Sequence, residues 1–366
     1  MESFFGKKQS IERALQLPRR LRNLGLLKTS YYKSKIKGSV HTVVSEQGKF
    51  RLLKFVSSHS ESKEGASRRL PLLIVPSLIN RYTILDLYSG CSVIESLMKS
   101  GQTVYLLDWG DSRPQDKHLS LSDHLDHGLA WALKKTLKDA DAPKLNLLGQ
   151  CLGGTLCALY ACHDSEKIQS LILLTTPIDF HVEGTFYQWA KHSNINLDEM
   201  LAAWGNVQAD FLDRSFKMLT PLGDIKQKGA LWTFGDREDF LKKHVAISEW
   251  VKNSVPFPGQ AYKELIQYFY RDNILYQGEM VLEGSQETFS LGTLKKLKVP
   301  ILSFYAKGDI IVPNQSTRAL VHWVGKDNYK EVELHGGHIG CIVGKRGQNT
   351  LNTNLNQWLE THDQNS

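Results

Sequence analysis

The feature that most constrains the fold is an alternation of short apolar runs with segments of helical periodicity. The runs PLLIVPS, TVYLLDW, KLNLLG, SLILLTT and VPILSFYA occupy residues 71–77, 103–109, 144–149, 170–176 and 299–306. Between the early runs lie stretches such as LSDHLDHGLAWALKKTLKDA, in which apolar residues recur at helical spacing. Continuous apolar strands that alternate with amphipathic helices are typical of a mostly parallel sheet covered by helices on both faces. The sequence therefore predicts an α/β fold.

The alternation stops near residue 180 and resumes near residue 291. The intervening stretch contains the helical segments LDEMLAAW, REDFLKKHVAISEWV and AYKELIQYFYRDN, without apolar strands between them. We expect residues 180–290 to form a helical cap over the carboxyl edge of a catalytic core made of residues 41–179 and 291–366. The plainer interpretation of its many Trp and Tyr residues is that they build the core of the cap itself.

The excess positive charge of the chain is concentrated at its N-terminal end. The 366 residues include 45 Lys and Arg against 38 Asp and Glu, but residues 1–38 alone hold ten basic residues against two acidic ones. We therefore expect a basic N-terminal segment, residues 1–40, and a nearly neutral body that gives no reason to expect nucleic-acid binding. Residues 11–27 have helical spacing broken by Pro18. A short helix packed on the surface is the plainer interpretation, and a basic face for a partner or an anionic interface is the alternative.

Several classes of protein are disfavoured by what the sequence lacks. No stretch approaches the roughly 20 apolar residues of a membrane-spanning helix, and the N-terminus has no apolar core typical of a secretory signal. Five cysteines without a C-x-x-C pair fit neither a disulfide framework nor a zinc site. No G-x-G-x-x-G or Walker A sequence is present, so we expect no bound cofactor and no metal. A cytoplasmic protein is the default expectation.

The most informative motif is LNLLGQCLGG, residues 145–154. An apolar strand runs into this turn and a segment of helical spacing follows it, which is the context of a nucleophile elbow with Cys151 in the place that Ser usually holds. Gly149 and Gly153 would let neighbouring backbone approach closely. The N-terminus of the following helix would favour the thiolate form of Cys151.

Two candidate partners for Cys151 follow it in the chain. Asp309 comes directly after the apolar run 299–306, and His338 follows the segment YKEVEL. The order nucleophile, acid, histidine is that of the α/β-hydrolases. We expect His338 to accept the thiol proton and Asp309 to orient the imidazole. His335 competes for the same role, but His338 stands directly after a flexible Gly-Gly pair and is preferred.

An oxyanion hole requires two N–H donors. We expect one to be the backbone N–H of Leu152, the residue after the nucleophile. The other should come from the loop that follows the first core strand, with Ile79 the preferred donor. From the residues alone, an ordinary strand-to-helix connection explains this loop equally well.

The other cysteines and histidines have structural explanations. Cys157 and Cys162 lie on the helix after the elbow and are expected to be small core residues. The loose cluster of His118, His124 and His127 is interpreted as a surface feature. Asp108 also follows a strand, but it precedes the nucleophile in the sequence and is not expected to be the catalytic acid.

These motifs together resemble the polyhydroxyalkanoate synthases, specifically the short kind that works with a second subunit. The resemblance covers roughly residues 40–360. The matching segments are EQGKFRLLKF (46–55), LPLLIVPSLINRYTILDL (70–87), VYLLDWG (104–110), LNLLGQCLGGTLCALYA (145–161), LILLTTPIDFH (171–181), FPGQAYKELIQYFYRDN (257–273), KVPILSFYAKGDIIVP (298–313) and GGHIG (336–340).

The resemblance implies an α/β-hydrolase fold and a specific activity. The nucleophile, acid and histidine of the family fall on Cys151, Asp309 and His338, and its oxyanion donors fall near Ile79 and Leu152. The implied reaction joins (R)-3-hydroxyacyl-CoA, with 3-hydroxybutyryl-CoA the expected substrate, into polyester through a thioester on Cys151 and releases CoA. The implied partners are a non-catalytic second subunit, a second copy of the chain in a homodimer, and the surface of a cytoplasmic storage granule.

Two other functions are compatible with the same residues. One is a hydrolase with a Cys nucleophile, such as a thioesterase or an intracellular polyester depolymerase. The other is a non-catalytic protein that binds granules or partners, which an intact set of Cys151, Asp309 and His338 argues against.

Overall fold

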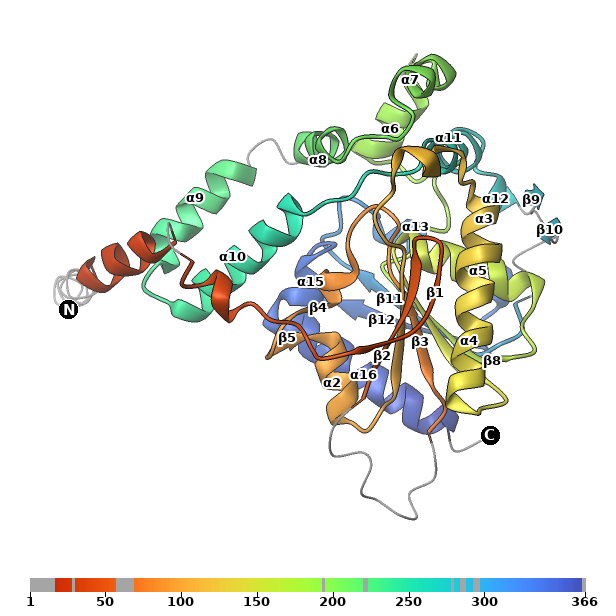
Figure 1. Ribbon diagram of the computed structural model, residues 1–366, viewed down its shortest axis with the longest axis horizontal. Helices are drawn as coiled ribbons and strands as arrows, with labels where there is room; N and C mark the ends of the chain where they lie inside the picture. Colours follow the sequence, from red (N-terminus) through yellow and green to blue (C-terminus); the bar gives the residue numbers. More distant parts are fainter. Residues whose placement is uncertain are drawn as a thin grey trace.

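The computed structural model describes residues 17–27, 30–56, 69–192, 195–219, 223–277, 280–283, 288–291 and 297–363. Among these residues, eight strands form one sheet in the order β1-β2-β6-β3-β7-β8-β11-β12 (Figure 1). The strands are β1 (Thr42–Gln47), β2 (Phe50–Phe55), β3 (Leu72–Val75), β6 (Val104–Asp108), β7 (Leu145–Gln150), β8 (Ile168–Leu174), β11 (Ile301–Ala306) and β12 (Tyr329–Leu334). Pairing is antiparallel from β1 to β6 and parallel from β6 to β12. The predicted α/β fold is confirmed.

The core strands are continuously apolar because both faces of the sheet are buried. In β3, Leu73 and Val75 belong to one apolar core, and Leu72 and Ile74 belong to the other. Side chains of successive residues in a strand point to opposite faces, so an uninterrupted apolar run is needed where helices cover both sides. The same alternation divides β6 between the two cores.

Helices cover each face of the sheet (Figure 1). One face packs against α5 (Leu152–His163) and a continuous helical stretch made of α3 (Leu121–Asp123), a π-helical segment (His124–Ala130) and α4 (Trp131–Ala140). The other packs against α2 (Val93–Lys99), α15 (Gly340–Val343) and α16 (Lys345–Asp363). Within the described residues, no helix combines the length and apolar character needed to cross a lipid bilayer.

A long insertion separates β8 from β11, and we call it the insertion below. Its helices are α6 (Thr185–His192), α7 (Leu197–Trp204), α8 (Ala209–Met218), α9 (Gly223–Phe234), α10 (Glu238–Lys252), α11 (Gly259–Glu264), a π-helical segment (Leu265–Arg271) and α12 (Ile274–Gln277). A hairpin of β9 (Met280–Glu283) and β10 (Thr288–Leu291) follows them. The sequence pattern gave no indication of this hairpin. In Figure 1, α9 and α10 extend away from the sheet.

The remaining described elements are short connections. They are the 3-10 turns Lys33–Lys35, Tyr82–Leu85 and Pro114–His118, the small strands β4 (Asp86–Tyr88) and β5 (Cys91–Ser92), and the helices α13 (Asn314–Arg318) and α14 (Val321–Val324). The turn Tyr82–Leu85 lies in the connection after β3, and α13 lies shortly after β11. Both connections therefore belong to the carboxyl edge of the parallel strands.

The basic N-terminal segment meets acidic residues of the insertion. Residues 17–26 are helical and include Pro18, whereas residues 1–16 and 28–29 lie outside the described part of the chain. Arg20 pairs with Asp236 at 3.4 Å, Lys33 with Glu249 at 2.9 Å, and Lys35 with Glu238 at 2.6 Å. The described part of this segment thus packs along α9 and α10, which agrees with the plainer interpretation of a surface-packing helix.

Candidate active site

Cys151 stands on a strained turn between β7 and α5. Its backbone angles are φ 52° and ψ −128°, a conformation that residues with a side chain rarely adopt. Two contacts hold the turn in place. The N–H of Cys151 donates to the carbonyl of Leu174 at 2.9 Å, and its own carbonyl accepts from the N–H of Gly154 at 2.8 Å. The predicted strand–turn–helix context is confirmed.

The glycines of the turn are required by close backbone packing. A Cβ at Gly149 would collide with the backbone of Gly154, and a Cβ at Gly153 would collide with the carbonyls of Val75 and Pro76. Gly153 therefore lets the start of α5 rest directly on the end of β3. This contact brings the elbow and the loop after β3 together, as the predicted oxyanion hole requires.

His338 and Asp309 form a buried pair at the same edge of the sheet. Nδ1 of His338 donates to Oδ2 of Asp309 at 2.7 Å. The other carboxylate oxygen of Asp309 accepts from the N–H groups of Ile311 and Val312, each at 2.9 Å. The thiol of Cys341 donates to the carbonyl of His338 at 3.2 Å. Both members of the pair are therefore fixed in position by their own loops.

The electrostatics of His338 connect this pair to the thiol. Burial on its own lowers the pKa of His338, but the negative charge on Cys151, together with hydrogen bonds to Asp309 and Cys151, outweighs burial and raises the pKa to about 10. The raised pKa of His338 favours the charged imidazolium form while a thiolate is present beside it. The structure thus brings together the three side chains that the sequence indicated.

The two predicted oxyanion donors lie on neighbouring loops. Leu152 is the first residue of α5, and its N–H has no acceptor within the helix. The N–H of Ile79 points to the hydroxyl of Ser77 at a long 3.4 Å. Sequence reasoning missed the support for this loop. The side-chain oxygen of Gln150 accepts from the N–H of Ser77 at 3.2 Å, which ties the loop after β3 to the elbow.

The competing residues have other roles in the structure. The carboxylate of Asp108 bonds to Arg51 and accepts from the N–H of Gly110 at 3.1 Å. His335 is exposed to solvent. Cys157 and Cys162 are buried, in agreement with the prediction that they are core residues.

The prediction for His124 was wrong. Its side chain is not on the surface but is 1% exposed, packed between the rings of Phe50 and Trp109. Its Nδ1 lies 2.7 Å from the carbonyl of Ser120. Burial and the charge of Lys49 lower the pKa of His124 to about 3, so it is a neutral core residue. His118 is exposed and His127 is half-buried.

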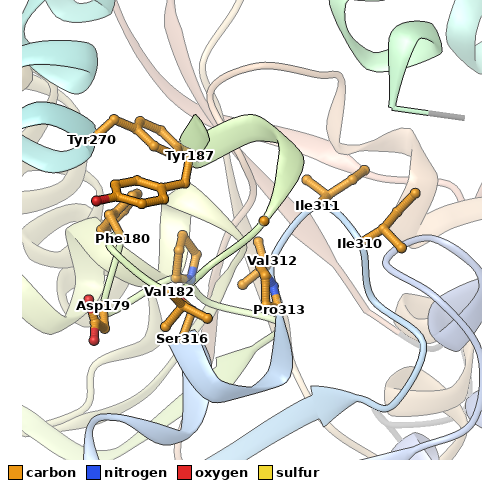
Figure 2. Close-up of a pocket in the computed structure, with 12 residues that line it drawn as sticks. Asp179, Phe180, Val182, Tyr187, Tyr270, Ile310, Ile311, Val312, Pro313 and Ser316 are labelled. Carbon is orange, nitrogen blue, oxygen red and sulfur yellow. The ribbon is translucent and has the colours of Figure 1, made fainter. Parts of the chain in front are cut away.

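A small cavity opens at the carboxyl edge of the sheet, next to the loop that follows Asp309, and we call it the edge cavity. Its walls come from residues 177–187, from Tyr270 and from residues 310–316. Figure 2 shows Tyr187 and Tyr270 on one side, Val312 and Pro313 in the middle, and Ile310 and Ile311 on the other side. Among the described residues, no group of three His, Cys, Asp or Glu side chains gathers as metal ligands do.

Comparison with known proteins places these observations in a family. A family model for the alpha/beta hydrolase fold matches residues 71–345. A crystal structure of a putative non-heme bromoperoxidase, BpoC, from Mycobacterium tuberculosis superposes with a TM-score of 0.52 at 11% identity. It covers 89% of this chain and 99% of that one. This structural likeness shows the fold alone.

The curated relatives are more specific. Proteins named poly(3-hydroxyalkanoate) polymerase subunit PhaC match from Synechocystis, at 32% identity over 79% of this chain and 77% of the relative, and from Allochromatium vinosum, at 30% over 84% and 85%. The relative from Haloferax mediterranei is 30% identical over 87% of this chain, which spans 63% of that protein, and the chain spans 66% of the one from Haloarcula marismortui. On these similarities, the chain belongs to the poly(3-hydroxyalkanoate) polymerase PhaC family of the α/β-hydrolase fold.

Proposed function

We propose that this protein polymerises (R)-3-hydroxyacyl groups from their CoA thioesters into polyhydroxyalkanoate and releases CoA. The observation that carries the proposal is the position of His338, which bonds Asp309 at 2.7 Å beside Cys151, in a member of the PhaC family. The relatives' names support the reaction type, and the proposed thioester mechanism is argued from the geometry of this site.

In the loading step, the Cys151 thiolate attacks the carbonyl carbon of the acyl-CoA. The oxyanion is stabilised by the N–H groups of Leu152 and Ile79, the carbon–sulfur bond to CoA breaks, and His338 supplies a proton to the departing CoA thiolate. One thioester replaces another, so the acyl group stays activated. A serine at this position would form an oxyester, which is a poorer acyl donor.

In the elongation step, the 3-hydroxyl of another 3-hydroxyacyl-CoA attacks the thioester on Cys151. His338, now neutral, accepts the hydroxyl proton, an ester bond forms, and the thiolate of Cys151 is released. The extended chain is now a CoA thioester, and attack by Cys151 reloads it with loss of CoA. Asp309 holds the imidazole with Nε2 directed at the reacting groups throughout.

The test is incubation of the purified protein with (R)-3-hydroxybutyryl-CoA, with CoA release followed by a thiol reagent and the acyl product identified. Insoluble polyester formed with stoichiometric CoA release is the expected result. Free 3-hydroxybutyrate would instead show a hydrolase, the alternative that the same residues allow. No CoA release, with Cys151 still labelled by iodoacetamide, would indicate the non-catalytic alternative.

We also propose that the basic N-terminal segment and the outer helices of the insertion contact a second subunit or the polymer surface. The support is a set of large apolar side chains left in solvent there: Leu17, Leu21 and Trp232 are 41%, 56% and 58% exposed. Deleting residues 2–30 is expected to impair activation by a partner subunit more than loading of Cys151. Equal loss of both would make the segment part of the catalytic fold.

A further inference from the structure

The loop after β3 carries one of the two predicted oxyanion donors, and we call residues 76–81 the oxyanion loop. Its first residues are tied to the sheet. The carbonyl of Pro76 accepts from the indole N–H of Trp109 at 2.9 Å, and the N–H of Ser77 donates to the side chain of Gln150 at 3.2 Å. Trp109 directly follows β6 and Gln150 ends β7. One end of the oxyanion loop is therefore held by the catalytic core.

The other end of the oxyanion loop is held by the insertion. Trp250 lies in the last turn of α10, and its indole N–H donates to the carbonyl of Arg81 at 2.9 Å. In return, Nε of Arg81 donates to the carbonyl of Asn253, the residue at which α10 ends, at 2.7 Å. This reciprocal pair of hydrogen bonds fixes the chain two residues after Ile79, the predicted donor.

The last turn of α10 has a firm seat of its own. Trp250 and Ala246 are buried and belong to the same apolar core as residues of α2, α15 and α16. From the solvent side, Lys33 of the N-terminal segment pairs with Glu249 at 2.9 Å. The indole N–H of Trp250 is therefore presented to the oxyanion loop from a fixed position.

Packing contacts alone do not fix the oxyanion loop, because open space adjoins it. A cavity of about 10 Å³, roughly the space of one water molecule, is lined by Leu78, Arg81 and Trp109 among others. A larger cavity of about 470 Å³ is lined by Arg81 and Tyr82 and, on α10, by Trp250. Where packing leaves such space, the hydrogen bonds at the two ends of the loop determine where its donor lies.

We propose that Trp250 is a positioning residue for the oxyanion hole, through which the insertion sets the direction of the Ile79 N–H. This inference rests on the proposed acyl-transfer function and adds to it a direct role for the insertion. The charge on the substrate oxygen develops in the transition state, so a displaced donor lowers kcat and leaves KM nearly unchanged. A group that is misplaced by about 1 Å can cost about 10²-fold in rate.

Two substitutions loosen the oxyanion loop from the side of the insertion. Trp250→Phe removes the indole N–H and keeps an aromatic ring in the core. Arg81→Lys keeps the positive charge and removes the Nε donor to Asn253. Trp358→Phe is the matched control, since the indole N–H of Trp358 also makes one hydrogen bond, to the hydroxyl of Ser170 at 3.1 Å, and lies on α16.

The experiment compares two reactions of Cys151 in each protein. Release of CoA from (R)-3-hydroxybutyryl-CoA passes through an oxyanion, whereas alkylation by iodoacetamide requires the thiolate but forms no oxyanion. We expect Trp250→Phe to lower kcat for CoA release about tenfold, since outright removal of an oxyanion donor costs about 10²–10³. Its KM and its alkylation rate should stay within about twofold of the wild type. Arg81→Lys should show the same pattern with a smaller loss, and Trp358→Phe should match the wild type in both reactions.

Equal losses in CoA release and in alkylation would overturn the proposal, because they would show a general disturbance of Cys151. A rise in KM at unchanged kcat would overturn it as well. Circular dichroism and thermal unfolding verify that each variant is folded, and Arg81→Lys decides alone if Trp250→Phe does not fold. A wild type that releases no CoA would overturn the proposed function and this inference with it. A wild type that releases CoA at the same kcat as Trp250→Phe would overturn only the role of Trp250.

Discussion

The carboxyl edge of the sheet and the outer helices of the insertion are built in opposite ways. At the sheet edge, Cys151, Asp309 and His338 are each less than a tenth exposed, and backbone hydrogen bonds hold their loops. On the insertion, Met218 and Trp232 are 71% and 58% exposed. The two regions therefore differ in exposure and in how hydrogen bonds hold them, which fits the proposals that the chemistry takes place at the sheet edge and that the outer helices of the insertion contact other molecules.

The strongest test of this contrast is Asp309→Asn. The amide keeps the shape of the side chain but cannot hold His338 in the same tautomer, and the comparable change in a serine protease triad costs about 10⁴-fold in kcat. We expect a loss of that order in CoA release with the fold retained. Asp108→Asn, at the carboxylate that bonds Arg51, should retain most of the activity. Similar losses in the two variants would contradict the assignment of Asp309.

A titration of His338 tests the electrostatic interaction between its imidazole and the Cys151 side chain. In the wild type, the negative charge of Cys151 helps to raise the pKa of His338 to about 10. In Cys151→Ser that charge is lost while the lowering effect of burial remains, so the pKa should fall below the wild-type value. NMR of ¹⁵N-labelled histidine against pH gives both values. An identical titration in the two proteins would mean that the thiol and the imidazole do not interact.

Gln150→Leu tests the support of the loop after β3. The change removes the acceptor for the buried N–H of Ser77, and an unsatisfied buried donor costs about 1–3 kcal/mol. We expect roughly a tenfold fall in kcat/KM for CoA release, since removing an oxyanion donor outright costs about 10²–10³. Gln150→Glu keeps an oxygen in place and should recover part of the loss. A loss in thermal stability without any change in kcat/KM would limit Gln150 to a structural role.

The smallest effect is expected where the N-terminal segment contacts the insertion. There, Arg20→Ala removes the ion pair with Asp236. A partly exposed pair at 3.4 Å contributes about 1 kcal/mol or less. Loading of Cys151 should stay within about twofold of the wild type, while limited proteolysis of the N-terminal helix becomes faster. A large loss of loading would show that this helix and the catalytic edge are coupled.

The sequence was most informative where local pattern and tertiary environment agree. Uninterrupted apolar runs predicted β3, β6, β7, β8 and β11, because a strand buried on both faces requires such a run. The glycines around Cys151 predicted the elbow, since only glycine permits backbone contacts as close as that of Gly153 with Pro76. The nearness of Asp309 to His338 could be expected because both follow parallel strands, which end at one edge.

Prediction failed where a partner is distant in the chain and carries no local signal. His124 looks like one of several surface histidines until Phe50 and Trp109 enclose it. The hydrogen bond from the N–H of Ser77 to the side chain of Gln150 joins two loops, and neither loop has a sequence pattern that predicts it. The strands of the β9–β10 hairpin have only four residues each, MVLE and TFSL, so neither forms an uninterrupted apolar run of the kind that marks the core strands. The size of the edge cavity depends on segments brought together only by the insertion.

The contacts of the N-terminal segment also determine when that segment can fold during synthesis of the chain. Arg20 and Lys35 find their acidic partners Asp236 and Glu238 more than 200 residues later in the chain. At about 5–20 residues per second, the ribosome takes roughly 10–40 seconds to supply those partners. During that interval, a basic and apolar helix emerges without the surface that later covers it. Newborn chains should therefore be most vulnerable to aggregation, and most dependent on chaperones, until α10 has left the ribosome.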